Sequence, residues 1–140
     1  MKEALTIATP LVSAYLILVG LLIGSFINLA ADRLPRGESV ISPRSHCRAC
    51  GRQLSVVDLL PVAGYLLRGG RCATCRTPIG AAAPLVEALA GLCVGISIAS
   101  LGLWPGAAIG FGLVALWGLA VVRFTKRQRS RAGAASRVPA

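Results

Sequence analysis

Acidic residues are scarce in this sequence, which has five aspartates and glutamates among 140 residues, against fifteen lysines and arginines. After Asp58 the only carboxylate belongs to Glu87. A mechanism in which two carboxylates hold and activate a water molecule therefore lacks its residues in the second half of these 140 positions. Charged residues of both signs make up 14% of the chain, well below the ~25% typical of soluble domains. This scarcity excludes an ordinary water-soluble globular domain.

Two signatures of common binding sites are also missing. No Gly-x-Gly-x-x-Gly motif follows a plausible strand, so the sequence gives no indication of a Rossmann-type nucleotide site. The arginine-rich middle of the chain contains a single aromatic residue, Tyr65. Zinc sites and arginines also occur in nucleic-acid-binding proteins, but the basic residues here follow the pattern expected of membrane topology, so we predict no nucleic-acid partner.

Long hydrophobic runs are abundant, and 55% of the residues are hydrophobic with a mean hydropathy of +0.72. Three runs approach or exceed the ~20 residues that a membrane-spanning helix needs. They predict an all-α membrane protein with three transmembrane helices at residues 8–31, 81–103 and 104–124. The last two helices should form a hairpin, with Trp104-Pro105-Gly106 as the turn, because proline starts a helix well.

The basic residues predict how the chain crosses the membrane. Eight arginines lie between residues 32 and 80, and six basic residues lie between Arg123 and the C-terminus. Because arginine and lysine favour the cytoplasmic side, residues 1–7 are expected outside the cytoplasm, with the loop at 32–80 and a basic tail at 125–140 inside it. Each predicted helix also has a Gly-x-x-x-Gly spacing that suits close helix packing, namely Gly20 with Gly24, Gly91 with Gly95, and Gly106 with Gly110.

Four cysteines in the loop form two Cys-x-x-Cys pairs, Cys47 with Cys50 and Cys72 with Cys75. Their spacing is close to that of tetrahedral zinc sites with four thiolates, and it predicts a small zinc-ribbon-like loop. Gly51 permits the positive φ that such a turn often needs. Two disulfides are the alternative, which an oxidising compartment would favour and the reducing cytoplasm disfavours. With four sulfur ligands the zinc would have no free coordination position, so we expect a structural role and no catalytic residue.

Two residues near this pattern are expected to stay outside it. His46 precedes Cys47, but four cysteines already complete a tetrahedral shell, so a solvated histidine or one that supports a ligand is favoured over a fifth ligand. Cys93 lies in the second hydrophobic run and is most simply a small buried apolar residue.

Ordered motifs between residues 20 and 91 resemble the N-terminal domain of the type IV prepilin peptidases. They are Gly24-Ser25-Phe26-Ile27-Asn28, Arg33-Leu34-Pro35-Arg36-Gly37-Glu38-Ser39, Pro43-Arg44-Ser45-His46-Cys47, the two cysteine pairs, Pro78-Ile79 and Pro84-Leu85-Val86-Glu87. The resemblance implies a multi-pass protein of a bacterial inner membrane. The enzymes of this family cleave the leaders of prepilins and type II secretion pseudopilins and then methylate the new N-terminus with S-adenosylmethionine. The resemblance also implies that Gly37, Glu38 and Arg44 lie in the loop associated with methylation.

The sequence departs from the family in two places. The family's peptidase uses two aspartates in later membrane helices, and this sequence has no aspartate after Asp58. The segment that starts at Asp58 has Leu59 where the family usually has asparagine, and Asp58 is expected to pair with an arginine.

Two hypotheses follow. In the first, the chain is a stand-alone prepilin-peptidase N-terminal module that binds zinc and acts with prepilins or a separate peptidase subunit. It would lack peptidase activity alone, and N-methyltransferase activity with S-adenosylmethionine would be the activity to test. In the second, the chain is a non-enzymatic accessory or scaffold subunit of another membrane complex.

Overall fold

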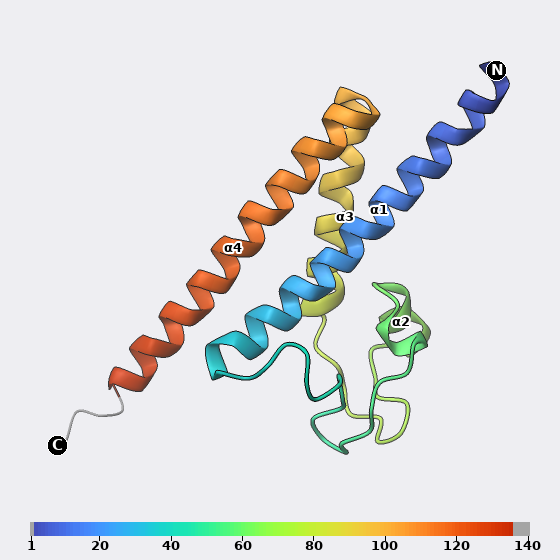
Figure 1. Cartoon of the computed structure of the whole chain (residues 1–140). Helices are drawn as coiled ribbons and strands as arrows, with labels where there is room; N and C mark the ends of the chain where they lie inside the picture. The colour runs from blue at the N-terminus through green and yellow to red at the C-terminus, as the bar shows by residue number, and fades with distance from the viewer. Residues whose placement is uncertain (1, 136–140) are drawn as a thin grey trace.

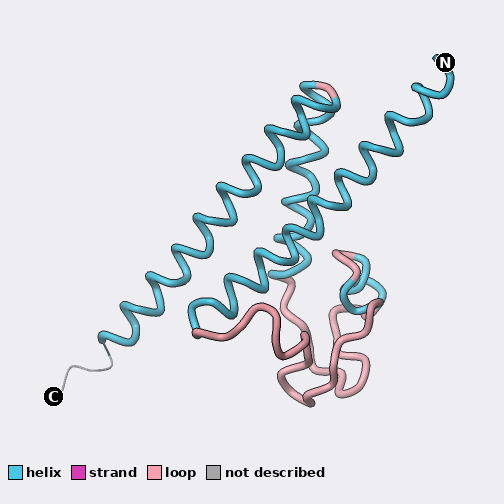
Figure 2. The backbone as a smooth tube through the Cα atoms, in the orientation of Figure 1, coloured by secondary structure: helices cyan, strands magenta, loops and turns pink. Residues whose placement is uncertain are grey.

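The computed structural model describes the backbone of residues 2–135 and the side chains of residues 8–130. Three long helices form a bundle, and a loop between the first and second carries the remaining short elements (Figures 1 and 2). No strand occurs in residues 2–135. The predicted all-α fold is therefore confirmed. The helices are α1 (Lys2–Arg33), η1 (Leu34–Arg36), η2 (Val57–Leu59), α2 (Ala63–Leu67), α3 (Ala82–Leu101) and α4 (Leu103–Ala135).

The three long helices are long and apolar enough to cross a membrane, judged by length and composition. The candidate spans are Ala8–Arg36, Ala82–Leu101 and Leu103–Ser130. Many large apolar side chains on these helices point outward, including Leu11, Leu92 and Leu116, each more than half exposed. A soluble bundle would bury such residues, whereas lipid covers them at no cost.

The core of the bundle is narrow and built from small residues. Ile27, Ala90, Val94 and Val114 are buried where α1, α3 and α4 meet. A Cβ atom at Gly24 would lie 2.9 Å from both the Ala90 Cβ and the Glu87 Cα, and one at Gly110 would lie 2.9 Å from the Val94 Cα. The predicted close packing at glycine is therefore confirmed at these helix contacts.

Gly24→Ala is expected to force α1 away from α3, because backbone and Ala90 occupy the space that the new methyl group needs. Overpacking of this kind typically destabilises a protein by about 1–2 kcal/mol. Gly112→Ala is the matched control, since no atom lies within 4 Å of a Cβ at Gly112. Unfolding in mixed micelles with increasing dodecyl sulfate should show a lower midpoint for Gly24→Ala alone. Equal midpoints for the two variants would contradict this packing.

The turn between α3 and α4 lies earlier than the sequence analysis predicted. Helix α3 ends at Leu101, Gly102 adopts a φ of +86°, and α4 begins at Leu103. Trp104, Pro105 and Gly106 therefore belong to the first turn of α4, and the prediction of a turn at these residues was wrong. Glycine reaches positive φ at little cost, and a proline in the first helical turn loses no hydrogen bond, so Gly102 is the better turn position.

Helix α4 also continues beyond residue 124, where the sequence analysis ended the third hydrophobic helix. It runs through the basic residues to Ala135, and residues 136–140 of the predicted tail lie outside the described part of the chain. Between Thr125 and Arg131 there is neither glycine nor proline, and arginine, lysine and glutamine are good helix formers. The change from apolar to basic side chains therefore ends the hydrophobic run without ending the helix.

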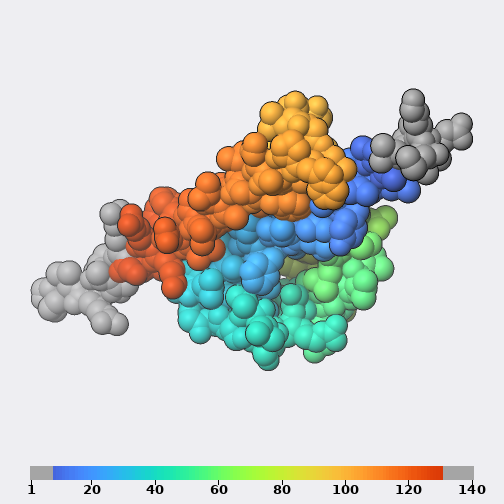
Figure 3. Space-filling view, turned by 45° about the horizontal axis from the view of Figure 1, so that its top comes forward, coloured from blue at the N-terminus to red at the C-terminus, as the bar shows by residue number. Residues whose placement is uncertain are grey.

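The loop packs beside the bundle at the end where α1 finishes and α3 begins. Figure 3 shows the loop, coloured cyan to green, against the blue helix α1. The chain leaves α1 through η1, whose C-cap Gly37 has a φ of +72°, and returns to the bundle at Ala82. One end of the bundle thus carries all four cysteines of the loop.

Candidate metal centre

The two cysteine pairs lie on two turns with the same hydrogen-bonding pattern. In the first turn the Cys47 N–H donates to the Arg52 carbonyl at 2.8 Å, and the Gly51 N–H donates to the Cys47 carbonyl at 2.8 Å. In the second turn the Cys72 N–H donates to the Thr77 carbonyl at 3.0 Å, and the Arg76 N–H donates to the Cys72 carbonyl at 3.1 Å. Each turn therefore presents two sulfurs in the same direction.

The residue after the second cysteine of each turn takes a left-handed conformation. Gly51 has a φ of +72°, which confirms the expectation from the sequence. Arg76 occupies the equivalent position with a φ of +58°, although it is not a glycine. A non-glycine residue with positive φ is uncommon and is usually held there by its surroundings. The second turn therefore depends on its surroundings to hold Arg76 at a positive φ.

The four cysteine sulfurs are positioned to bind one metal ion. All four lie within 4.8 Å of one another, with 3.8 Å between the Sγ atoms of Cys47 and Cys75 and 3.9 Å between those of Cys50 and Cys72. Tetrahedral zinc with Zn–S bonds of ~2.3 Å places its sulfurs about 3.8 Å apart. A disulfide needs an S–S distance of about 2.05 Å, and all five cysteines are free. The geometry thus fits a shared cation and not two disulfides.

The thiols of this cluster have strongly divergent pKa values. Backbone N–H groups of Cys75 and Thr74 lower the pKa of Cys72 to about 6. The backbone of Arg52 would lower the pKa of Cys50, but burial and the neighbouring sulfurs outweigh it and raise that pKa to about 11. Four thiolates this close repel one another, so one ionises easily at the expense of another. A divalent cation at the centre would remove this conflict and hold all four as thiolates.

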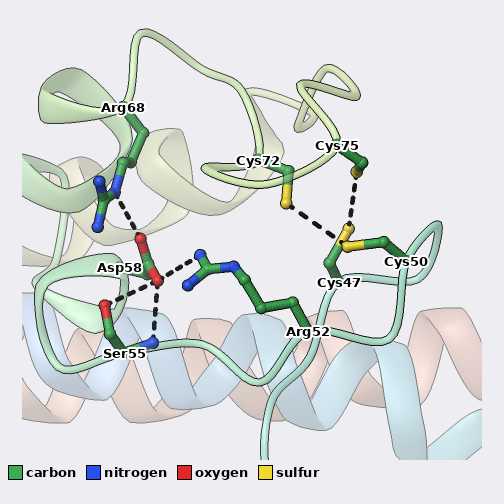
Figure 4. A network of polar contacts seen from close by, with 8 residues as sticks. All are labelled: Cys47, Cys50, Arg52, Ser55, Asp58, Arg68, Cys72 and Cys75. Carbon is green, nitrogen blue, oxygen red and sulfur yellow. Dashed lines mark hydrogen bonds and ion pairs between the residues drawn. The ribbon is translucent and has the colours of Figure 1, made fainter.

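Asp58 joins the two cysteine turns through a buried carboxylate (Figure 4). Its Oδ2 accepts hydrogen bonds from Arg52 at 2.6 Å and from the Ser55 N–H and hydroxyl at 2.9 and 2.8 Å, while its Oδ1 accepts one from Arg68 Nε at 2.7 Å. Arg52 follows the first turn, and Arg68 lies four residues before Cys72. Only 6% of the Asp58 side chain is exposed. One carboxylate therefore fixes the approach of both turns.

Burial alone would raise the pKa of Asp58, but the hydrogen bonds from Ser55 and the two guanidinium groups hold this pKa well below its usual range. The pKa of Arg52 is raised, chiefly by Asp58 and further by the Cys72 sulfur, so this guanidinium connects the carboxylate with the cluster. The expectation that Asp58 pairs with an arginine is confirmed, and it pairs with two.

A second carboxylate attaches the loop to the bundle. Glu87, in the second turn of α3, is 7% exposed, and its Oε2 accepts a hydrogen bond from the Val62 N–H at 2.7 Å. Both carboxylates also line a cavity of about 490 Å³ between the loop and the bundle, together with Ser25, Asn28 and Tyr65. The sequence analysis named Glu87 as the only carboxylate after Asp58 and as part of a family motif, and it did not anticipate this contact.

The residues that the resemblance associated with methylation lie beside the metal centre and not within it. Gly37 caps η1, Glu38 pairs with Arg36 at 2.7 Å, and Arg44 is exposed. Glu38 lines a second cavity of about 480 Å³ with His46 and Arg48. Arg48 pairs with Asp32 at the end of α1.

His46 and Cys93 lie outside the sulfur cluster. The Nδ1 of His46 forms a hydrogen bond with the Arg44 carbonyl at 3.0 Å, and its backbone pairs with Gln53 as an isolated β-bridge. Cys93 packs at the edge of the bundle core.

The signal for Asp58 was present in the sequence, because Ser55-x-x-Asp58 is a capping pattern and Asp58 is the only acidic residue between Glu38 and Glu87.

Comparison with known proteins places the similarity in the region just described. Residues 18–101 match the family model described as the bacterial peptidase A24 N-terminal domain. This range runs from α1 through the whole cysteine loop to the end of α3. No solved structure matches the chain significantly.

Several curated proteins named prepilin leader peptidase/N-methyltransferase are similar to the chain. The protein from Myxococcus xanthus is 40% identical over 59% of this chain and 25% of its own length. That from Burkholderia pseudomallei strain K96243 is 35% identical over 73% of this chain and 41% of its own length. That from Bacillus subtilis is 37% identical over 59% of this chain and 36% of its own length. The chain thus spans between a quarter and about two fifths of these relatives, in their N-terminal part.

Proposed function

Because the chain belongs to the bacterial peptidase A24 N-terminal domain family, we propose that it is a zinc-binding membrane module for processing prepilin-type substrates. The observation that carries the proposal is a four-sulfur site held rigidly at one end of a membrane bundle, within the region that matches the family. In this proposal the module binds the prepilin or pseudopilin, and a peptidase half with two aspartates performs the cleavage.

Zinc is the metal we propose for the site. Four thiolates in tetrahedral arrangement suit zinc, and the intracellular environment of a bacterium keeps the thiols reduced. Zinc bound by four sulfurs has no position for water or substrate, so its contribution is structural. Cys47, Cys50, Cys72 and Cys75 would hold it, and Arg52 would offset part of the negative charge of the tetrathiolate.

We also propose the topology that the arginines predict, with the loop and the end of α4 in the cytoplasm and the start of α1 outside. The loop arginines and the basic residues from Arg123 to Arg129 lie at the same end of the bundle as the cysteines (Figure 1). Placing both groups in the cytoplasm satisfies the preference of basic residues for that side. The metal centre is then in a reducing compartment, which agrees with free cysteines.

The proposal assigns peptide cleavage to a separate peptidase half and leaves methyl transfer as the activity open to this chain. These 140 residues contain one carboxylate after Asp58, so they should not hydrolyse a peptide by an aspartyl mechanism. Methylation needs no such pair. We therefore place methyl transfer from S-adenosylmethionine, if it belongs to this chain, in the loop with Gly37, Glu38 and Arg44.

Reconstitution tests this division. The purified 140-residue protein is placed in vesicles with a prepilin and S-adenosylmethionine, with and without a peptidase half that carries both aspartates. We expect stoichiometric zinc by elemental analysis, no cleavage by the chain alone, and cleavage followed by methylation when the two parts are combined. Mass spectrometry of the prepilin N-terminus distinguishes cleavage from methylation. Cleavage by the 140 residues alone would contradict the division.

The second candidate is a non-enzymatic scaffold, favoured by the basic loop surface. Arg44, Arg48 and Arg76 are exposed there and could contact an acidic partner. This function predicts stoichiometric zinc and a stable complex on affinity purification from the native membrane, but neither activity with any peptidase half. Methylation of a mature pilin N-terminus by the chain would rule the scaffold out as its only function.

A further inference from the structure

Six large apolar side chains are exposed on one stretch of the loop outside the bundle. We call residues 56–67 the apolar segment; its exposed members are Val56, Val57, Leu59, Leu60, Leu66 and Leu67. Val56 is 76% exposed, and Leu66 and Leu67 are each 69% exposed. No charged residue occurs from Leu59 to Leu67, and Asp58 is buried in its ion pairs. Proteins rarely leave so much apolar surface in water unless a partner or membrane covers it.

The apolar segment is attached to a membrane-spanning helix inside the span. The Val62 N–H donates to Glu87 Oε2 at 2.7 Å. Glu87 lies five residues into α3, which begins at Ala82, so at 1.5 Å per residue the contact is about 7.5 Å inside the end of the span.

Local contacts also hold the segment in this position. Val62 has a φ of +58°, which is rare for a β-branched residue and requires surrounding contacts to hold it. Within the segment, a Cβ at Gly64 would lie 2.6 Å from the Val57 carbonyl oxygen, so α2 packs directly on η2. The depth of the segment is therefore fixed by the fold.

Charged residues resume directly after the apolar segment ends at Leu67. Arg71 is exposed just after Gly69 and Gly70, whereas Arg68 is paired with Asp58. In Figures 1 and 3, α2 lies beside α1, whereas the turns that carry the cysteines lie farther along the loop. Arginines next to an apolar surface are the arrangement that suits anionic headgroups above acyl chains.

We propose that the apolar segment lies in the membrane interface and inserts Val56, Leu66 and Leu67 into the lipid. Interfacial segments bury their apolar face about 5–10 Å into the boundary of headgroups and acyl chains, which matches the depth set by Glu87. The segment thus holds the metal centre against the bilayer on the side of the loop. This goes beyond the proposed function, since it requires insertion of the chain in a bilayer but neither zinc-dependent nor prepilin-processing activity.

Tryptophan fluorescence in vesicles tests the proposal. In the full chain with Trp104→Phe and Trp117→Phe, a single tryptophan is introduced as Leu66→Trp, or as Leu67→Trp in a second protein. The vesicles contain phosphatidylcholine and phosphatidylglycerol, with or without acyl chains brominated near the headgroup. We expect blue-shifted emission that loses most of its intensity in brominated vesicles and little of it to iodide in water.

Thr74→Trp in the same background is the matched control, because Thr74 is exposed between the two cysteines of the second turn. Its emission should be lost to iodide and retained in brominated vesicles. A protein with Trp117 alone reports insertion of α4, so loss of its response would indicate failed insertion and not a failed proposal. If both leucine positions respond as Thr74→Trp does, the proposal is overturned. It is also overturned if neither quencher reaches them, which would mean that another copy of the chain covers the segment.

Discussion

Cys72→Ser is expected to abolish stoichiometric zinc binding and to unfold the loop while the three long helices remain. Cys72 is the most buried of the four loop cysteines, at 2% exposure. The loop has few buried apolar residues of its own, and in small zinc domains the metal contributes on the order of 10 kcal/mol to folding. The second turn is affected most, because Arg76 holds a positive φ there.

The measurement combines elemental analysis with limited trypsin digestion in vesicles. Arg52 and Arg68 are protected by their hydrogen bonds to Asp58, and both should become rapid cleavage sites once the loop unfolds. Cys93→Ser is the matched control, because Cys93 packs at the edge of the bundle core, far along the chain from the loop turns. It should bind zinc and resist trypsin as the unchanged protein does. Full zinc content with intact trypsin resistance in Cys72→Ser would contradict a four-cysteine site.

The sequence predicted the features that depend on local pattern. Hydrophobic runs indicate spans because the membrane thickness sets the helix length, and paired Cys-x-x-Cys motifs indicate a metal site because tetrahedral coordination sets the ligand spacing. The turn at Gly102 was missed because Trp104-Pro105-Gly106 contains a stronger combination of turn residues. Proline is equally suited to the first turn of a helix, and the sequence alone does not separate these two uses.

The contacts that position the metal site depend on tertiary structure and could not be read from the sequence. Glu87 and Val62 are twenty-five residues apart, and their hydrogen bond exists only because the loop folds back onto α3. Asp58 has eight loop arginines as candidate partners, and the fold selects Arg52 and Arg68. Arg48 follows the first cysteine of the loop but pairs with Asp32, near the end of α1, sixteen residues earlier in the chain.

Asp58→Asn is expected to destabilise the loop by about 3 kcal/mol, or roughly a hundredfold in its opening equilibrium. The asparagine keeps the shape of the side chain but leaves Arg52 and Arg68 without a counter-charge. Removing one partner of a buried ion pair costs about 3–5 kcal/mol, and the lower end applies because these arginine side chains retain 26% and 35% exposure. The rate at which a chelator removes zinc should rise accordingly.

Asp32→Asn is the matched control for this prediction. Asp32 also pairs with two arginines, Arg36 and Arg48, but its side chain is 39% exposed. Exposed ion pairs contribute only about 0–1 kcal/mol, so this variant should release zinc nearly as slowly as the unchanged protein. If a chelator removed zinc equally fast from both variants, the loss of a negative charge, and not the buried position of Asp58, would determine the stability of the loop.

The pH dependence of loop stability shows whether Asp58 acts through its charge or through its shape. Because the folded protein holds the pKa of Asp58 below that of the unfolded chain, its contribution to stability is fully present above the ordinary aspartate pKa of about 3.9. It is lost as the pH falls from there toward the lowered pKa, since the unfolded state then binds the additional proton. Trypsin is inactive in this range, so loop opening is followed by hydrogen exchange. The difference in the free energy of loop opening between the unchanged protein and Asp58→Asn should be constant near neutral pH and shrink below about pH 4, in addition to the loss of zinc that both proteins share when acid protonates the thiolates. A difference that persists unchanged into acid would mean that Asp58 acts through hydrogen bonds that asparagine cannot replace, and not through its charge.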